Sequence, residues 1–178
     1  MSLQNTVYTF GLKLAHAVLN PGWVQSEETP TPTVYIIQDQ QDESAPATGT
    51  YVAISGSPRL SSIGQAHTEP QAEDDPEAEG PDDSRGIVQP YVGTLVFWEV
   101  NGDGGYLQTI KDSVWLDSVR TLLESTGVAV LDVGDVEDVG YKIDNRWIPQ
   151  SRMTMEVSVA NRITETLSTI NTVEITRV

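Results

Sequence analysis

Cysteine is absent from this chain of 178 residues, and cationic side chains are few. Without cysteine there is no disulfide, no thiolate nucleophile and no thiolate metal site, as is usual for proteins of reducing compartments. Lys and Arg number 10 against 26 Asp and Glu, which gives a formal net charge of −16 with no basic cluster along the sequence. Such a chain repels phosphate groups, which argues against specific nucleic-acid binding.

Histidine and long apolar runs are also scarce. His16 and His67 are the two histidines, and neither has a partner at metal-site or nucleophile–base spacing. We place His16 on a helix and His67 in a loop, as structural or surface residues. No segment approaches the roughly 20 apolar residues that cross a bilayer, and the N-terminus lacks the pattern of a signal peptide. We therefore expect a soluble protein without catalytic residues, metal or cofactor.

The remaining composition is that of one globular domain, which we assign to residues 1–178. Hydrophobic residues make up 38% and charged residues 20% of the chain, enough for a single core. The charge is uneven, because residues 67–86 hold eight carboxylates and one arginine, a net −7. Like charges and prolines prevent this stretch from burying apolar surface, so we predict a mobile acidic insertion at 66–86.

Hydrophobic periodicity predicts an α+β fold with a mostly antiparallel sheet and two main helices packed on one face. The segment 153–160 alternates most regularly, with two methionines and two valines on one side. We expect 161–168 to form a hairpin connection or a helical turn, and 134–145 to be a turn-rich link. The predicted helices are 3–18 and 106–125, and the predicted strands are 34–37, 51–57, 87–100, 128–133, 153–160 and 172–177.

Two acidic or glycine-rich turns could be mistaken for sites. The sequence NGDGG at 101–105 lacks the lysine and hydroxyl of a phosphate loop, and a calcium loop would need glutamate where Ile110 stands. We interpret it as a turn that caps a helix. The carboxylates of Asp135, Glu137 and Asp138 could bind a cation or act as acid and base, but we expect a solvated turn.

The segment DNRWIPQSR offers a candidate for partner binding, because it places Trp147 between Arg146 and Arg152 in an acidic chain. One interpretation is that Trp147 packs over the edge of the sheet. The other is an interface anchor, since tryptophan and arginine most often carry binding energy at protein contacts.

Several segments together resemble the neck terminator proteins of tailed bacteriophages. These are the strand YVGTLVFWEV, the amphipathic stretch GGYLQTIKDSVWLDSVRTLLESTGVAV, the segment DNRWIPQSRMTMEVSV with Trp147-Ile148-Pro149 at its strand start, and the closing INTVEITRV. The likeness is concentrated in residues 91–178, and the acidic insertion is particular to this chain.

The resemblance implies a structural virion protein of the neck, assembled in the host cytoplasm, that caps the tail tube and joins it to the head connector. It implies a homo-oligomeric ring, usually of six subunits, through which DNA passes without specific binding. The expected partners are further copies of the chain, the tail tube protein, the connector or stopper protein and a sheath protein. The alternatives are a head or tail completion factor or minor tail protein without a ring, or a small cytoplasmic enzyme or acidic binding module.

In such a ring the acidic insertion has two possible roles beyond that of a solvated loop. Facing the channel, its carboxylates would repel DNA, and facing outward they would bind a basic partner subunit. We favour the outward arrangement, because a flexible insertion would obstruct a narrow channel. The carboxylates concerned are Glu73, Asp74, Asp75, Glu77, Glu79, Asp82 and Asp83.

Overall fold

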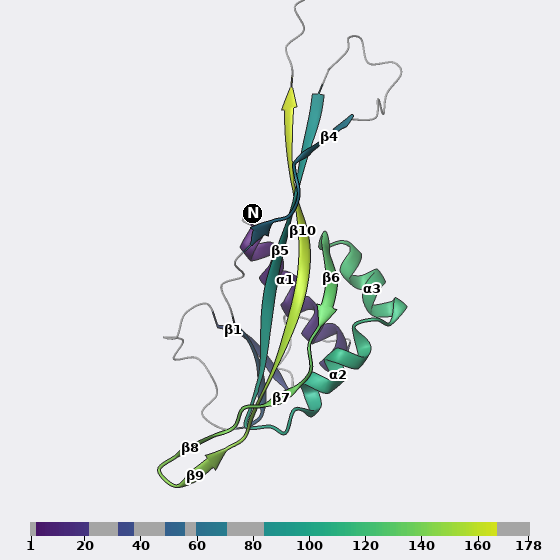
Figure 1. Cartoon of the computed structure of the whole chain (residues 1–178). Coiled ribbons are helices and arrows are strands. Elements are labelled where there is room, and N and C mark those ends of the chain that lie inside the picture. Colours follow the sequence, from purple (N-terminus) through teal and green to yellow (C-terminus); the bar gives the residue numbers. More distant parts are fainter. Residues whose placement is uncertain (1–2, 22–31, 38–48, 56–59, 71–83, 167–178) are drawn as a thin grey trace, which may run out of the picture.

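The computed structural model describes residues 3–21, 32–37, 49–55, 60–70 and 84–166, which form helices around one large sheet (Figure 1). The helices are α1 (Leu3–Leu19), α2 (Gly105–Ser113) and α3 (Asp117–Glu124). The strands of the main sheet are β1 (Thr33–Ile37), β2 (Tyr51–Ser55), β3 (Ser61–Ser62), β4 (His67–Pro70), β5 (Ser84–Val100), β6 (Val128–Val133), β7 (Glu137–Asp138) and β10 (Gln150–Thr166). A separate hairpin contains β8 (Tyr141–Ile143) and β9 (Arg146–Ile148).

The sheet is built around the pair β5 and β10. Its order is β1-β2-β5-β10-β6, with β3 and β4 on β5 and β7 on β10, and among the described strands only β1 and β2 pair in parallel. β5 and β10 pair along all 17 residues of each strand, a length of about 55 Å at the usual rise per residue. The predicted α+β fold with a mostly antiparallel sheet is therefore confirmed.

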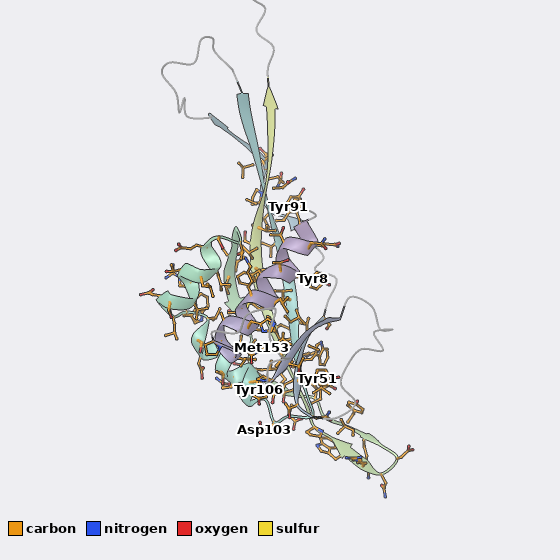
Figure 2. All side chains as sticks on the ribbon, turned by 180° about the vertical axis from the view of Figure 1, so that it is seen from behind. Tyr8, Tyr51, Tyr91, Asp103, Tyr106 and Met153 are labelled. Carbon is orange, nitrogen blue, oxygen red and sulfur yellow. The ribbon has the colours of Figure 1, made fainter. Side chains whose placement is uncertain are left out.

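The core lies on one face of this sheet. The alternating residues predicted in 153–160 are buried, and they lie beside buried residues of β5 in the antiparallel register. α1 crosses this face, as Figure 2 shows from behind, and contributes Val7, Phe10 and Leu14 to the same core. The buried strand residues are Val52, Ile54, Leu95, Phe97, Met153, Met155, Val157 and Val159.

The second predicted helix, 106–125, is wrong as a single element, because it breaks at Leu116 into α2 and α3. In a continuous helix, the positions seven and eight residues after Ile110 would share its buried face. These positions are Asp117 and Ser118, which are polar. The extended backbone of Leu116 (φ −67°, ψ 136°) resets the helical phase so that α3 buries Val119 and Leu123 instead.

The break leaves a group of large apolar side chains on the surface. Trp115, Leu116 and Leu122 are each 54% exposed, although they lie within the helix predicted at 106–125. Trp115 is therefore not a core residue. Gly127 has φ 67° just beyond α3, where the sequence predicted the helix to stop.

Three other predictions about connections are wrong. Residues 161–166 do not turn but continue β10, because they pair with the first residues of β5. His67 lies in strand β4 opposite Val88 and not in a loop. The predicted link 134–145 contains β7 and β8, and Asp144 and Asn145, both with positive φ, turn the chain into β9. The predicted strand 172–177 lies outside the described residues.

Candidate interaction surfaces

The start of α2 is organised around a buried carboxylate, Glu99, at the end of β5. Its Oε1 accepts a hydrogen bond from the backbone N of Gly104 (3.1 Å), and its Oε2 accepts from Tyr106 (2.9 Å) and Leu107 (3.2 Å). The side chain is 1% exposed. A carboxylate at a helix N-terminus satisfies free N–H groups and favours the helix dipole, so Glu99 stabilises the turn that the sequence predicted as a helix cap.

The glycines of this turn fit around Glu99. A Cβ on Gly102 would collide with the Glu99 carboxylate, and Gly104 adopts φ 90° with Ser151 and Val136 pressed against it. A pocket of about 580 Å³ opens beside the turn, lined by Glu99, Asn101 and Tyr106 among others. Because Glu99 already accepts from the helix N–H groups, the turn is not a phosphate cradle.

The carboxylates near β7 have separate partners. Asp135 accepts a hydrogen bond from Lys111 at 2.5 Å, which lowers the pKa of Asp135. Glu137 pairs with Arg152, and Asp138 accepts from the backbone N of Gly140 at 3.0 Å.

Within the described part of the chain, no group of three His, Asp or Glu is placed to hold a metal ion. Nor is any helix described there long and apolar enough to cross a membrane.

The hairpin β8–β9 projects from the end of the sheet beyond β7 (Figure 1). Trp147 is 57% exposed, and its ring packs on Gly140, where a Cβ would collide with it. Register pairs Trp147 with Lys142, so both side chains lie on the same face, while Tyr141 lies on the other. Arg146 is also exposed on this hairpin. The predicted pair Arg146 and Trp147 thus stands on a projecting element, rather than packing over the edge of the main sheet.

Arg152 lies apart from that pair, within the sheet. Its Nη2 forms an ion pair with Glu137, and its guanidinium stands 5.9 Å from the centroid of the Trp98 ring. Its Nε is buried and has no hydrogen-bond partner among the described residues. Arg152 therefore holds β7 against β10, and it does not join Arg146 and Trp147 in one patch. The seven predicted acidic interface residues between 73 and 83 lie outside the described residues.

A second surface, which the sequence did not suggest, lies at the corner between α2 and α3. A pocket of about 410 Å³ opens there between α3 and β6, with Phe10 and Val114 deep in it and Trp115 at its edge. β6 is the last strand in the sheet order, so its outer backbone groups carry no strand partner among the described residues. The missed signal was the polar pair Asp117-Ser118, which breaks the helical stripe and exposes its apolar neighbours.

Residues 13–178 match the family of phage neck terminator proteins. The chain belongs to this family. The match runs from residue 13, within α1, through the hairpin to beyond the end of β10, and it includes most of both surfaces described above. A comparison with curated proteins finds no match. As a neck terminator, the protein is a structural component of the phage virion that contacts other head and tail proteins.

Proposed function

We propose that the protein forms a homo-oligomeric ring, of six subunits, that caps the tail tube and joins it to the head connector. The observation that carries this proposal is the family match over residues 13–178. A ring at this place sits at the head–tail junction of the virion, is assembled in the host cytoplasm, and touches the tube protein, the connector or stopper protein and, where the tail has one, the sheath.

Two structural features support a ring subunit over an enzyme. Two of the described carboxylates are engaged within the fold, since Glu99 accepts from the backbone of α2 and Glu137 pairs with Arg152. The molecule also extends beyond its core at both ends, through the long β5–β10 pair and through the β8–β9 hairpin (Figure 1). Projections of this kind suit contacts with several neighbours, and a structural role requires no chemistry.

The net charge of −16 supports the passage of DNA without binding. Six copies place about six times that charge around one channel, and like charges prevent the counterion release that drives DNA binding. Within such a ring, the acidic stretch faces outward and meets a basic partner subunit through residues 71–83, since residues 67–70 and 84–86 belong to the paired strands β4 and β5. Arg146, Trp147 and Arg152 lie toward protein partners in the same proposal.

Negative-stain electron microscopy of the purified protein, alone and mixed with tail tubes, tests the ring. We expect closed rings of one diameter, either free or seated on tube ends. Light scattering then gives the subunit number. Monomers that do not bind to tube ends would overturn the proposal and favour a completion factor or minor tail protein.

A charge-neutral variant tests the acidic insertion separately. Replacing the seven carboxylates between residues 73 and 83 by Gln or Asn changes the net charge from −16 to −9, since seven negative charges are removed. We expect rings to persist while co-sedimentation with neighbouring neck and tail proteins weakens. Unchanged co-sedimentation at low and moderate salt would reduce the insertion to a solvated loop.

A further inference from the structure

Two apolar features of the described surface lie on different parts of the subunit and remain open to solvent. One is a projection, the exposed Trp147 on the β8–β9 hairpin. The other is a recess, the pocket of about 410 Å³ between α3 and β6. The hairpin lies at the lower end of the molecule and α3 on its right side in Figure 1, so one subunit cannot fill its own recess.

The recess is suited to an aromatic side chain. Its interior is apolar, with Phe10 and Val114 fully or nearly fully buried and Leu123 and Val128 forming its sides. Trp115, 54% exposed at the edge, offers a ring against which a second aromatic ring can pack. The volume exceeds that of one indole ring, which leaves room for the side chain to enter without rearranging the core.

The hairpin presents its tryptophan in a fixed orientation. Gly140 supports one side of the ring, because any larger residue there would collide with it. Lys142 stands opposite Trp147 in the register, so a positive charge accompanies the ring. A tryptophan held in this way loses little conformational entropy on binding, which is a property of residues that dominate interfaces.

Two charged side chains line the recess, Arg120 and Glu124, and Arg120 lies 3.8 Å from Asp117 on its own helix. Glu124 lies on the rim, is exposed, and forms no ion pair within the described part of the chain. It can accept from the ammonium of Lys142 or from the indole N–H. A buried tryptophan needs such an acceptor, and the open edge of β6 supplies further carbonyl oxygens.

We propose that Trp147 of one subunit inserts into the α3–β6 recess of a second copy of this chain. The inference rests on the proposed ring, and it names the contact that builds it. Because the projection and the recess are different surfaces, the contact is head-to-tail. A head-to-tail contact closes into a ring where its rotation closes on itself, as the proposed ring requires.

Substitutions on either side of the contact test the proposal in the full-length protein. Trp147→Ala removes the projection, and Ala129→Arg fills the recess from β6, where Ala129 is exposed. We expect each variant to weaken the subunit contact by about 30-fold or more, as hot-spot residues do, and to remain folded by circular dichroism. The two variants mixed should form one-to-one pairs but no rings, because only one productive contact remains in each pair.

Matched controls separate this contact from general loss of apolar surface. Tyr141→Ala alters the same hairpin on its other face, and Leu122→Ala removes a side chain as exposed as Trp115 that does not line the recess. Both should form rings as the natural sequence does. Rings that persist in Trp147→Ala and Ala129→Arg would overturn this contact while leaving the ring intact.

Cross-linking gives a second readout, since the chain has no cysteine of its own. Lys142→Cys combined with Glu124→Cys should yield a ladder of linked subunits with a short bismaleimide, on rings formed alone or on tube ends. Lys142→Cys combined with Gln108→Cys, on the exposed side of α2, should not. A ladder from the control pair alone would overturn the inference. Failure of the natural sequence to assemble, alone and on tubes, would overturn the ring and this contact together.

Discussion

The two halves of the β5–β10 pair share one hydrogen-bond register but differ in what covers them. Residues 91–100 and 150–159 lie against the helices, and their inward side chains are buried in the core. Residues 84–90 and 160–166 continue the same ladder beyond the helices, and β4 is the described strand that pairs alongside them (Figure 1). Pairing therefore sets the shape of both halves, while burial stabilises chiefly the covered one, since an isolated ribbon is marginal in water.

Proline substitutions in β10 should separate the two halves most clearly. Val157→Pro lies between β5 and β6 and removes a fully buried side chain, so we expect a loss of more than about 3 kcal/mol and no folded protein. Ile163→Pro, in the projecting half, should lower the melting temperature by only a few degrees. Thermal unfolding followed by circular dichroism measures both, and equal losses would mean that the two halves unfold as one unit.

Glu99 marks the point where the covered half of β5 passes into α2. Glu99→Gln weakens three backbone hydrogen bonds to a buried group, and we expect it to destabilise the fold by about 1–3 kcal/mol. Amide exchange should rise first at Tyr106 and Leu107. Asp103→Asn is the control, because Asp103 is exposed and, among the described residues, accepts from Gly105 alone; a comparable loss there would contradict the role of Glu99.

The ion pair of Arg152 and Glu137 lies in the covered half of the β5–β10 pair, on the face of the sheet opposite the core. The two side chains are 40% and 55% exposed, so solvent screens the pair and Glu137→Gln should cost less than about 1 kcal/mol. Urea unfolding at low and high salt measures this loss. A much larger effect would indicate that β7, rather than the helices, secures this edge of β10.

The smallest expected effect concerns His16, on the helix that covers the sheet. Burial lowers the pKa of His16 below its ordinary value of 6.5. The unfolded chain then binds the proton more readily, so stability is complete above about pH 7 and declines as the pH falls through 6.5 toward the folded pKa. His16→Gln should flatten that part of the stability profile, whereas an unchanged slope between pH 7 and 5 would assign it to other groups.

Periodicity predicted the elements whose faces differ in polarity. The alternation of 153–160 and the stripe of 3–18 identified β10 and α1, because a buried face imposes a pattern on the sequence. The break at Leu116 was missed since each half of 106–125 is helical by itself. The continuation of β10 to Thr166 was missed because a ribbon without a core imposes no such pattern.

The candidate surfaces were predictable only in part. Arg146 and Trp147 were identified by residue type, but the turn at Asp144 and Asn145 that projects them was not. The recess between α3 and β6 depends on residues as distant in sequence as Phe10 and Val128. Only the folded chain brings these together, so no local motif could have revealed it.

The length of the β5–β10 ladder also governs how the chain folds. Its pairs join residues 50 apart at Gln150 and Val100, and 82 apart at Thr166 and Ser84. Contacts between residues so far apart in sequence form slowly, because closing a long loop costs conformational entropy. This entropy cost is smallest for the pair Gln150 and Val100, at the end nearest the helices. We therefore expect the strands to pair first at that end and then progressively toward Thr166 and Ser84. β10 lies between β5 and β6 but is synthesised after both of them. β5 and β6 therefore cannot form their hydrogen bonds to β10 until the ribosome has released it. Subunits with a completed sheet, and hence competent to assemble, arise only after β10 has been synthesised.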